Sequence, residues 1–196
     1  VGISGLGNAD HALLLFLVDR AGADADGVRF AAMGTNLFDA LRIGQIDAAM
    51  LQEPALSLIT AAGGRELVNL MEIDEAHRYL GGAYEFMGVS VRAAERDRRL
   101  PEIRRLAAAL EGGLLDTRTL PPADIVAALP SALIAGGDVA RLEQIIERYR
   151  LSLYPDRVSI DVAAAERVRQ AQEAAGLLEP GQVDLETLLD TDALDG

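Results

Sequence analysis

The sequence predicts an α/β fold in which a parallel sheet, covered by helices, is followed by a mainly helical part. Two observations predict this. Short apolar runs alternate with helical stretches over the first 80 residues, whereas almost every segment after Arg92 has the pattern of a helix. Strands separated by single helices form right-handed βαβ units, in which neighbouring strands run parallel. The 196 residues are enough for a sizeable hydrophobic core.

The first half is expected to hold four strands joined by helices. The strands cover 1–4, 28–33, 46–51 and 66–70, and the helices between them cover 9–21, 36–43 and 53–62. Glycines at 22 and 44 suit the positions that follow the first two helices. Thr35 or Asn36 suits the cap of the second helix, and Pro54 suits the first turn of the third.

The second half is expected to be helical. A glycine-flanked segment, 81–91, contains a predicted strand from about Glu85, and the predicted helices that follow cover 101–110, 122–129, 138–150, 160–175 and 185–189. The apolar faces of these helices need more partner surface than the first half supplies. The acidic tail from Asp184 to Asp195 is expected to be partly frayed.

The composition excludes several classes of function. The formal charge of −13 and the pI of about 4.5 argue against nucleic acid and anionic membranes as partners. The chain has neither cysteine nor lysine, which excludes thiolate chemistry and Schiff bases. Its longest strongly apolar stretch, 12–18, is too short to cross a bilayer. No signal peptide is visible, and a start at Val1 rather than Met leads us to expect a missing upstream segment.

The carboxyl ends of the strands are the predicted binding site, because ligands of open parallel sheets lie there. These ends are the loops Ser4–Asp10, Met33–Asn36 and Leu51–Glu53. At the helix starts, two interpretations stay open: the polar side chains contact a ligand, or they only cap the helices. This applies to Asn8, Asp10 and Glu53.

Known catalytic and cofactor motifs are incomplete in this chain. Asp10 stands where a dinucleotide-binding G-x-G-x-x-G motif needs its last glycine. His11 and His77 have no companion carboxylate at zinc-ligand spacing, and the serine elbow G-x-S-x-G is absent. We therefore expect no catalytic residue, no metal and no cofactor.

An aromatic segment and a basic segment each allow two interpretations. Tyr84 either stacks on a flat ligand or belongs to the core, and Phe86 is expected in the core. The arginines between 92 and 105 form either a solvated helix face, offset by Glu95 and Glu102, or a docking surface for a protein.

The order of motifs resembles the periplasmic substrate-binding proteins of ABC transporters, in the branch for nitrate, sulfonates, taurine and thiamine-pyrimidine precursors. The similar elements are Val1-Gly2-Ile3-Ser4, Gly7-Asn8-Ala9-Asp10-His11, the stretch 40–49 with Gly44 and Asp47-Ala48-Ala49, Glu53-Pro54, the segment 84–110 and the segment 164–190. Together they span nearly the whole chain.

The resemblance implies a type II periplasmic binding fold, in which two lobes close on a small ligand. Residues 1–80 would form a ligand-binding lobe, 81–92 a hinge or crossover strand, and 93–196 a helical portion of the other lobe, whose N-terminal part is absent. By matching positions and from the aromatic segment, the expected ligand-binding residues are Ser4, Gly7, Asn8, Ala9, Asp10, Gly34, Thr35, Glu53 and Tyr84.

The resemblance also implies a non-catalytic, periplasmic receptor that delivers a small organic molecule to ABC permease and ATPase subunits without entering the membrane itself. Asn8 and Asp10 stand where the family usually has serine and threonine. Since the additional carboxylate repels an oxyanion, we expect a neutral or cationic solute such as an amine or a pyrimidine. Two alternatives share the fold: an enzyme of the pyrimidine or menaquinone-pathway type, the former disfavoured by the lack of cysteine, and a ligand-sensing domain of a regulator.

Overall fold

A small parallel sheet organises the first part of the chain. The computed structural model describes residues 1–85, 87–134 and 137–194. Strand β1 (Gly2–Ile3) pairs in parallel with β2 (Ala31–Ala32), so that Gly2 lies opposite Ala31. On its other side Gly2 forms a parallel bridge with Ala49. The predicted α/β class and the parallel course of these first three segments are therefore confirmed.

The strands are much shorter than predicted. The prediction of a strand over 28–33 holds only for β2, and that over 46–51 holds only for the bridge at Ala49. Among the described residues, 66–70 and 87–91 form no strand. A strand exists only where another backbone offers hydrogen bonds, and no neighbouring segment does so here.

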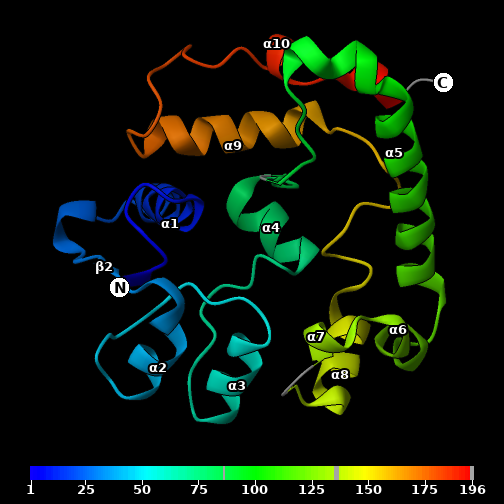
Figure 1. Ribbon diagram of the computed structural model, residues 1–196. Helices are drawn as coiled ribbons and strands as arrows, with labels where there is room; N and C mark the ends of the chain where they lie inside the picture. Colours follow the sequence, from blue (N-terminus) through cyan, green and yellow to red (C-terminus); the bar gives the residue numbers. More distant parts are fainter. Residues whose placement is uncertain (86, 135–136, 195–196) are drawn as a thin grey trace.

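Four helices accompany the sheet (Figure 1): α1 (Ala9–Arg20), α2 (Leu37–Arg42), α3 (Ala55–Ala61) and α4 (Ile73–Leu80). The first three were predicted, and Gly22 and Gly44 end two of them with a positive φ. Helix α4 was missed, because no element was assigned to residues 71–80. Helix α4 is strongly amphipathic, buries Ala76 and Leu80, and ends at the left-handed Gly81.

The second half is helical, as predicted. It comprises α5 (Arg96–Thr119), α6 (Pro122–Ala128), α7 (Ser131–Ile134), α8 (Val139–Tyr149), α9 (Val162–Ala174) and α10 (Leu185–Leu188). Short 3-10 turns lie at 25–27, 34–36, 93–95 and 191–194. Across the described residues, no helix is both long and apolar enough to pass through a bilayer.

Helix α5 is longer than predicted at both ends and carries Pro101 inside it rather than in its first turn. Proline removes one helical hydrogen bond, but ion pairs support the turns around it. Glu95 accepts from Arg98 at 2.7 Å and from Arg99 at 3.2 Å, and Glu102 accepts from Arg99 at 3.2 Å. These pairs agree with the interpretation of this segment as a charge-compensated helix face; the alternative, a docking surface for a protein, stays a prediction.

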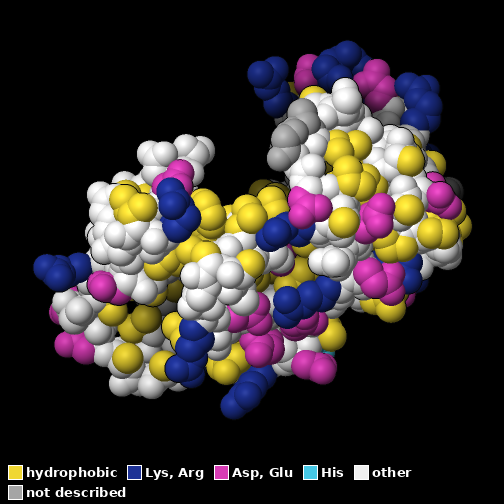
Figure 2. Space-filling view, turned by 90° about the horizontal axis from the view of Figure 1, so that it is seen from below, with side chains coloured by type: hydrophobic (Ala, Val, Ile, Leu, Met, Phe, Trp, Pro, Cys, Tyr) yellow, Lys and Arg dark blue, Asp and Glu magenta, His cyan; other side chains and the backbone are white. Residues whose placement is uncertain are grey.

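Helix α9 joins the second half of the chain to the first half by packing on α1 (Figure 1). Within the second half, α6 packs on α8, and the turn 191–194 packs on α5. The buried apolar residues are few and many are alanines, while yellow apolar side chains lie open across the face in Figure 2. The described core is thin for a chain of this length.

The segment that leaves α4 is held against α9 by an arginine. Arg167 of α9 donates to the carbonyl oxygen of Ala83 at 3.0 Å, and Asp161 donates its backbone N–H to Glu85 at 3.2 Å. Gly82 has a φ of +148°, and a Cβ there would lie 2.6 Å from the Arg167 guanidinium carbon. The backbone conformation thus favours glycine, and a side chain at this position would also displace the Arg167 guanidinium.

We expect Gly82→Ala to lower the free energy of unfolding by about 1–2 kcal/mol, because the new methyl group strains φ and displaces Arg167. Urea denaturation measures the change. Gly88→Ala in the same segment is the control, since a Cβ there meets nothing within 4 Å and its φ is ordinary. Equal effects of the two substitutions would contradict this account.

Candidate functional site

The three predicted ligand loops leave the same edge of the sheet, which we call the rim: residues 4–10, 33–36 and 51–53. Because the segments at Gly2, Ala31 and Ala49 run parallel, their carboxyl ends point the same way. Gly34 donates its N–H to the carbonyl oxygen of Ser4 at 3.2 Å, and Met50 donates to that of Gly2 at 3.4 Å. Backbone hydrogen bonds therefore hold the first two rim loops together and fix the start of the third beside β1.

Asp10 folds the first rim loop onto itself. Its carboxylate accepts hydrogen bonds from the backbone N–H of Ser4 at 2.5 Å, the hydroxyl of Ser4 at 2.8 Å and the N–H of His11 at 3.0 Å. A carboxylate in the first turn also interacts favourably with the positive end of the helix. Asp10 thus places a hydrogen-bonded negative charge in the first turn of α1.

The neighbours of Asp10 join the same network. Asn8 is the N-cap residue of α1, yet its side chain makes no capping bond and donates instead to the Ser4 hydroxyl at 3.0 Å. The left-handed Gly7 donates its N–H to Nδ1 of His11 at 3.1 Å. His11 also meets Phe30 edge to face, with ring centroids 4.8 Å apart. The sequence analysis did not predict that His11 accepts this bond. The available signal was its position at the start of a helix, four residues after Gly7.

The other predicted residues differ in their surroundings. Thr35 and Gly34 are exposed on the second rim loop. Glu53 is half-buried and precedes the N-cap residue of α3, and its carboxylate accepts from the N–H of Ser57 at 3.0 Å and from the Ser57 hydroxyl at 2.9 Å. These contacts agree with the second interpretation of Glu53, in which its carboxylate stabilises the start of a helix.

Tyr84 lies on the segment held by Arg167, away from the rim loops in sequence. Burial raises the pKa of its phenol to about 12. Phe86, expected in the core, lies outside the described residues. The structure thus brings Ser4, Asn8 and Asp10 into direct contact.

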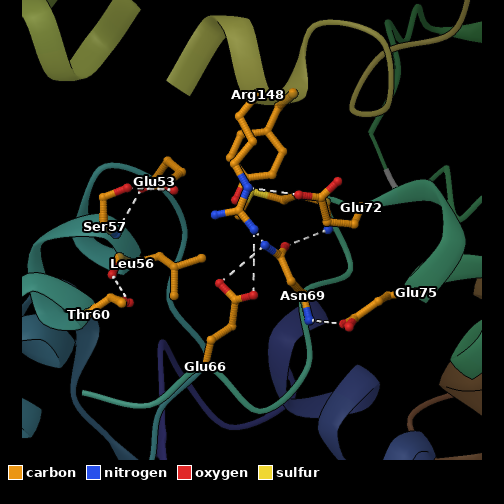
Figure 3. Close-up of polar contacts among 11 residues, drawn as sticks. Glu53, Leu56, Ser57, Thr60, Glu66, Asn69, Glu72, Glu75 and Arg148 are labelled. Atoms are coloured by element: carbon orange, nitrogen blue, oxygen red, sulfur yellow. Dashed lines mark hydrogen bonds and ion pairs between the residues drawn. The ribbon is translucent and has the colours of Figure 1, made fainter. Parts of the chain in front are cut away.

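A second polar cluster, shown in Figure 3, joins the loop before α4 to the end of α8. Asn69 and Tyr149 are 3% and 2% exposed, and the Asn69 amide donates to the Tyr149 hydroxyl at 2.9 Å. The same amide donates to Glu66 at 3.3 Å, and its oxygen accepts from the N–H of Met71 at 3.1 Å. The buried amide is therefore well satisfied.

Arg148 covers this contact from the solvent side. It donates to Glu72 at 2.8 Å, approaches Glu66 at 3.6 Å and stacks over the Tyr149 ring at 4.8 Å (Figure 3). Burial raises the pKa of Tyr149, which keeps the phenol neutral. We call Asn69, Arg148, Tyr149, Glu66 and Glu72 the clasp. No sequence pattern links residues 80 positions apart, so the clasp was not predicted.

Two shallow hollows lie elsewhere on the described surface. One, of about 220 Å³, is bordered by α5 and the turn 191–194, and the other, of about 370 Å³, by α6 and α8. Neither contains a predicted ligand residue. Since Ser4, Asn8 and Thr35 are exposed, a ligand enclosed at the rim would need a further wall of protein.

The comparisons with known proteins identify a fold but no family. No protein-family model matches the chain, and no curated protein matches it either. A solved structure of a protein from Bordetella bronchiseptica RB50 is similar, with a TM-score of 0.71 and 22% sequence identity. The match covers 93% of this chain but only 59% of that protein, so the chain spans about three fifths of its length. The two chains share a fold.

Asp10→Ala is expected to loosen the first rim loop, because it removes the acceptor of three hydrogen bonds. We expect a loss of about 1–3 kcal/mol in the free energy of unfolding and faster amide exchange at Ser4 and His11. Asp19→Ala, an exposed position at the other end of α1, is the control and should change both quantities little. Unchanged exchange at Ser4 in the Asp10 variant would refute the network.

Tyr149→Phe should destabilise the protein by about 1–2 kcal/mol, since the buried Asn69 amide loses one acceptor while the ring keeps its packing. Thermal or urea unfolding measures the difference. Tyr154→Phe, at a half-exposed ring 50% accessible to solvent, provides the matched control. Should both variants be as stable as the parent, the clasp contributes nothing to stability.

Proposed function

We propose that this chain is part of a solute-binding protein that captures a small organic molecule at the rim and passes it to an ABC importer. The observation that supports the proposal most is the convergence of three loops on one edge of a parallel sheet. Backbone hydrogen bonds hold two of these loops together at Ser4 and Gly34. Open α/β sheets bind their ligands at this place.

The geometry at α1 supports a solute that is neutral or cationic. The start of α1 already holds the Asp10 carboxylate, bonded to Ser4 and His11. An oxyanion such as a sulfonate would have to displace this carboxylate or lie beside it, and like charges repel. Protonated amines and amino-substituted pyrimidines carry hydrogen-bond donors and no negative charge, so they fit the rim better.

The proposed binding cycle uses two lobes of a type II periplasmic binding fold outside the cytoplasm. The solute would lie between the rim and an opposing wall, and the closed form would be selected by the permease. The similarity to a longer protein of the same fold is compatible with this, because the rim is exposed in this chain and two fifths of that protein lie outside the match.

A thermal-shift screen of the purified chain tests the proposal. An amine or pyrimidine at about one hundred times its Kd should raise the Tm by about 5–10 °C, whereas taurine should not. Thr35→Arg fills the rim and should abolish the shift. Gln45→Arg, which precedes the third strand segment at the opposite edge of the sheet, should preserve it. A shift with taurine alone, or one that Thr35→Arg leaves intact, would argue against the proposed site and ligand class.

A further inference from the structure

Helix α5 carries apolar side chains on two sides, one of which is largely open to solvent. Ala107 and Ala108 border the hollow beside the 3-10 turn that packs on α5. Residues three and four apart share one side of a helix, so Ile103, Leu106 and Leu110 form a separate stripe, roughly 130° around the axis. Leu106 and Leu110 are 43% and 44% exposed, and α5, described over its whole length, has no buried residue. Figure 1 shows α5 along the outer edge of the molecule, a place that another chain can reach.

Gly113 extends this stripe by one more turn, and the described residues give no reason for a glycine there. A Cβ at Gly113 would meet nothing within 4 Å, and the φ of Gly113 is not in the left-handed region. Inside a helix, glycine is less stable than alanine because it loses more backbone entropy on folding. Open space above a bare stretch of backbone is, however, what the large side chain of an adjoining helix needs.

The stripe fits a second copy of itself when the two α5 helices run antiparallel. With a two-fold axis midway between Leu106 and Leu110, each Leu106 lies opposite Leu110 of the other copy. The same axis places Ile103 opposite Gly113, so that the larger side chain fills the space above the glycine. In a parallel pair each residue would face its own counterpart, and the two glycines would leave a gap. The stripe is therefore self-complementary in one orientation.

The charged residues at the two ends of the stripe favour the same orientation. Arg99 lies one turn before Ile103, and its Nε and Nη1 bond to Glu95 and Glu102, which leaves Nη2 for a further carboxylate. Within the described residues, the carboxylate of Asp116, beside the other end of the stripe, has no hydrogen-bond or ion-pair partner. An antiparallel pair brings Arg99 of each copy next to Asp116 of the other, whereas a parallel pair brings like charges together.

We infer that the stripe formed by Ile103, Leu106, Leu110 and Gly113 joins two copies of this chain through antiparallel α5 helices. The same stripe supplies both the large side chains and the space that receives them, and both the cation and the carboxylate. This self-complementarity favours a second copy over an unrelated protein. The pairing does not depend on the proposed solute, so the two proposals can fail separately.

Sedimentation of the chain between about 1 and 200 μM tests the pairing. We expect a monomer–dimer equilibrium with a Kd of about 1–100 μM, because one helix pair is a small interface. Leu110→Asp should raise the Kd tenfold or more. Leu115→Asp is the matched control: Leu115 is 61% exposed on the same helix but lies about 140° away from Leu110, so the Kd should stay unchanged. Circular dichroism verifies that both variants fold.

The orientation has its own test, since the chain contains no cysteine. An equal mixture of the Ile103→Cys and Gly113→Cys variants, oxidised with glutathione disulfide, should form the mixed disulfide at least several-fold faster than either variant alone. A chain that stays monomeric at 200 μM, or a dimer that both aspartate variants weaken equally, would overturn the inference. Faster linkage between like variants would overturn the antiparallel arrangement.

Discussion

Gly2 is the residue on which the arrangement of the sheet depends, because three segments meet at its backbone and leave no space for a side chain. It lies opposite Ala31 on one side and Ala49 on the other. A Cβ at this position would lie 2.4 Å from Cδ1 of Ile46 and 2.7 Å from Cδ2 of Leu37. A side chain at this position would therefore displace the ends of the Ile46 and Leu37 side chains, which pack α2 and the third segment onto β1. This packing aligns the three rim loops.

The rim loops are held largely by their own polar side chains. Asp10 bonds to Ser4 and His11, and Glu53 bonds to Ser57, so both carboxylates already have partners. Such bonds fix the loops in place before any ligand arrives, which lowers the ordering cost of binding. They also mean that a solute at the rim would meet mainly exposed groups such as Thr35 and backbone amides of the first loop.

The sequence predicted the features that local patterns encode. Alternating apolar runs indicated the parallel βαβ order, and Gly22 and Gly44 marked helix ends correctly. The failures concern contacts with distant segments. Whether 66–70 becomes a strand depends on a neighbouring backbone, and the side-chain partners of Asp10 depend on how the loop folds back. Asn69 and Tyr149 are 80 residues apart in the sequence, and the local pattern of apolar residues does not predict contacts at such a separation.

The way the halves are joined limits where the chain can move. The buried residues of α1 and α9 are mostly alanines, namely Ala12, Ala164 and Ala171, whose small side chains allow a close approach. Arg167 adds a bond from α9 to the segment after α4. Helices α5 to α8 form an arm that contacts the first half through the clasp. In the clasp, partly exposed ion pairs surround one buried hydrogen bond. Movement that accompanies binding is therefore expected at this arm, while α9 stays with α1.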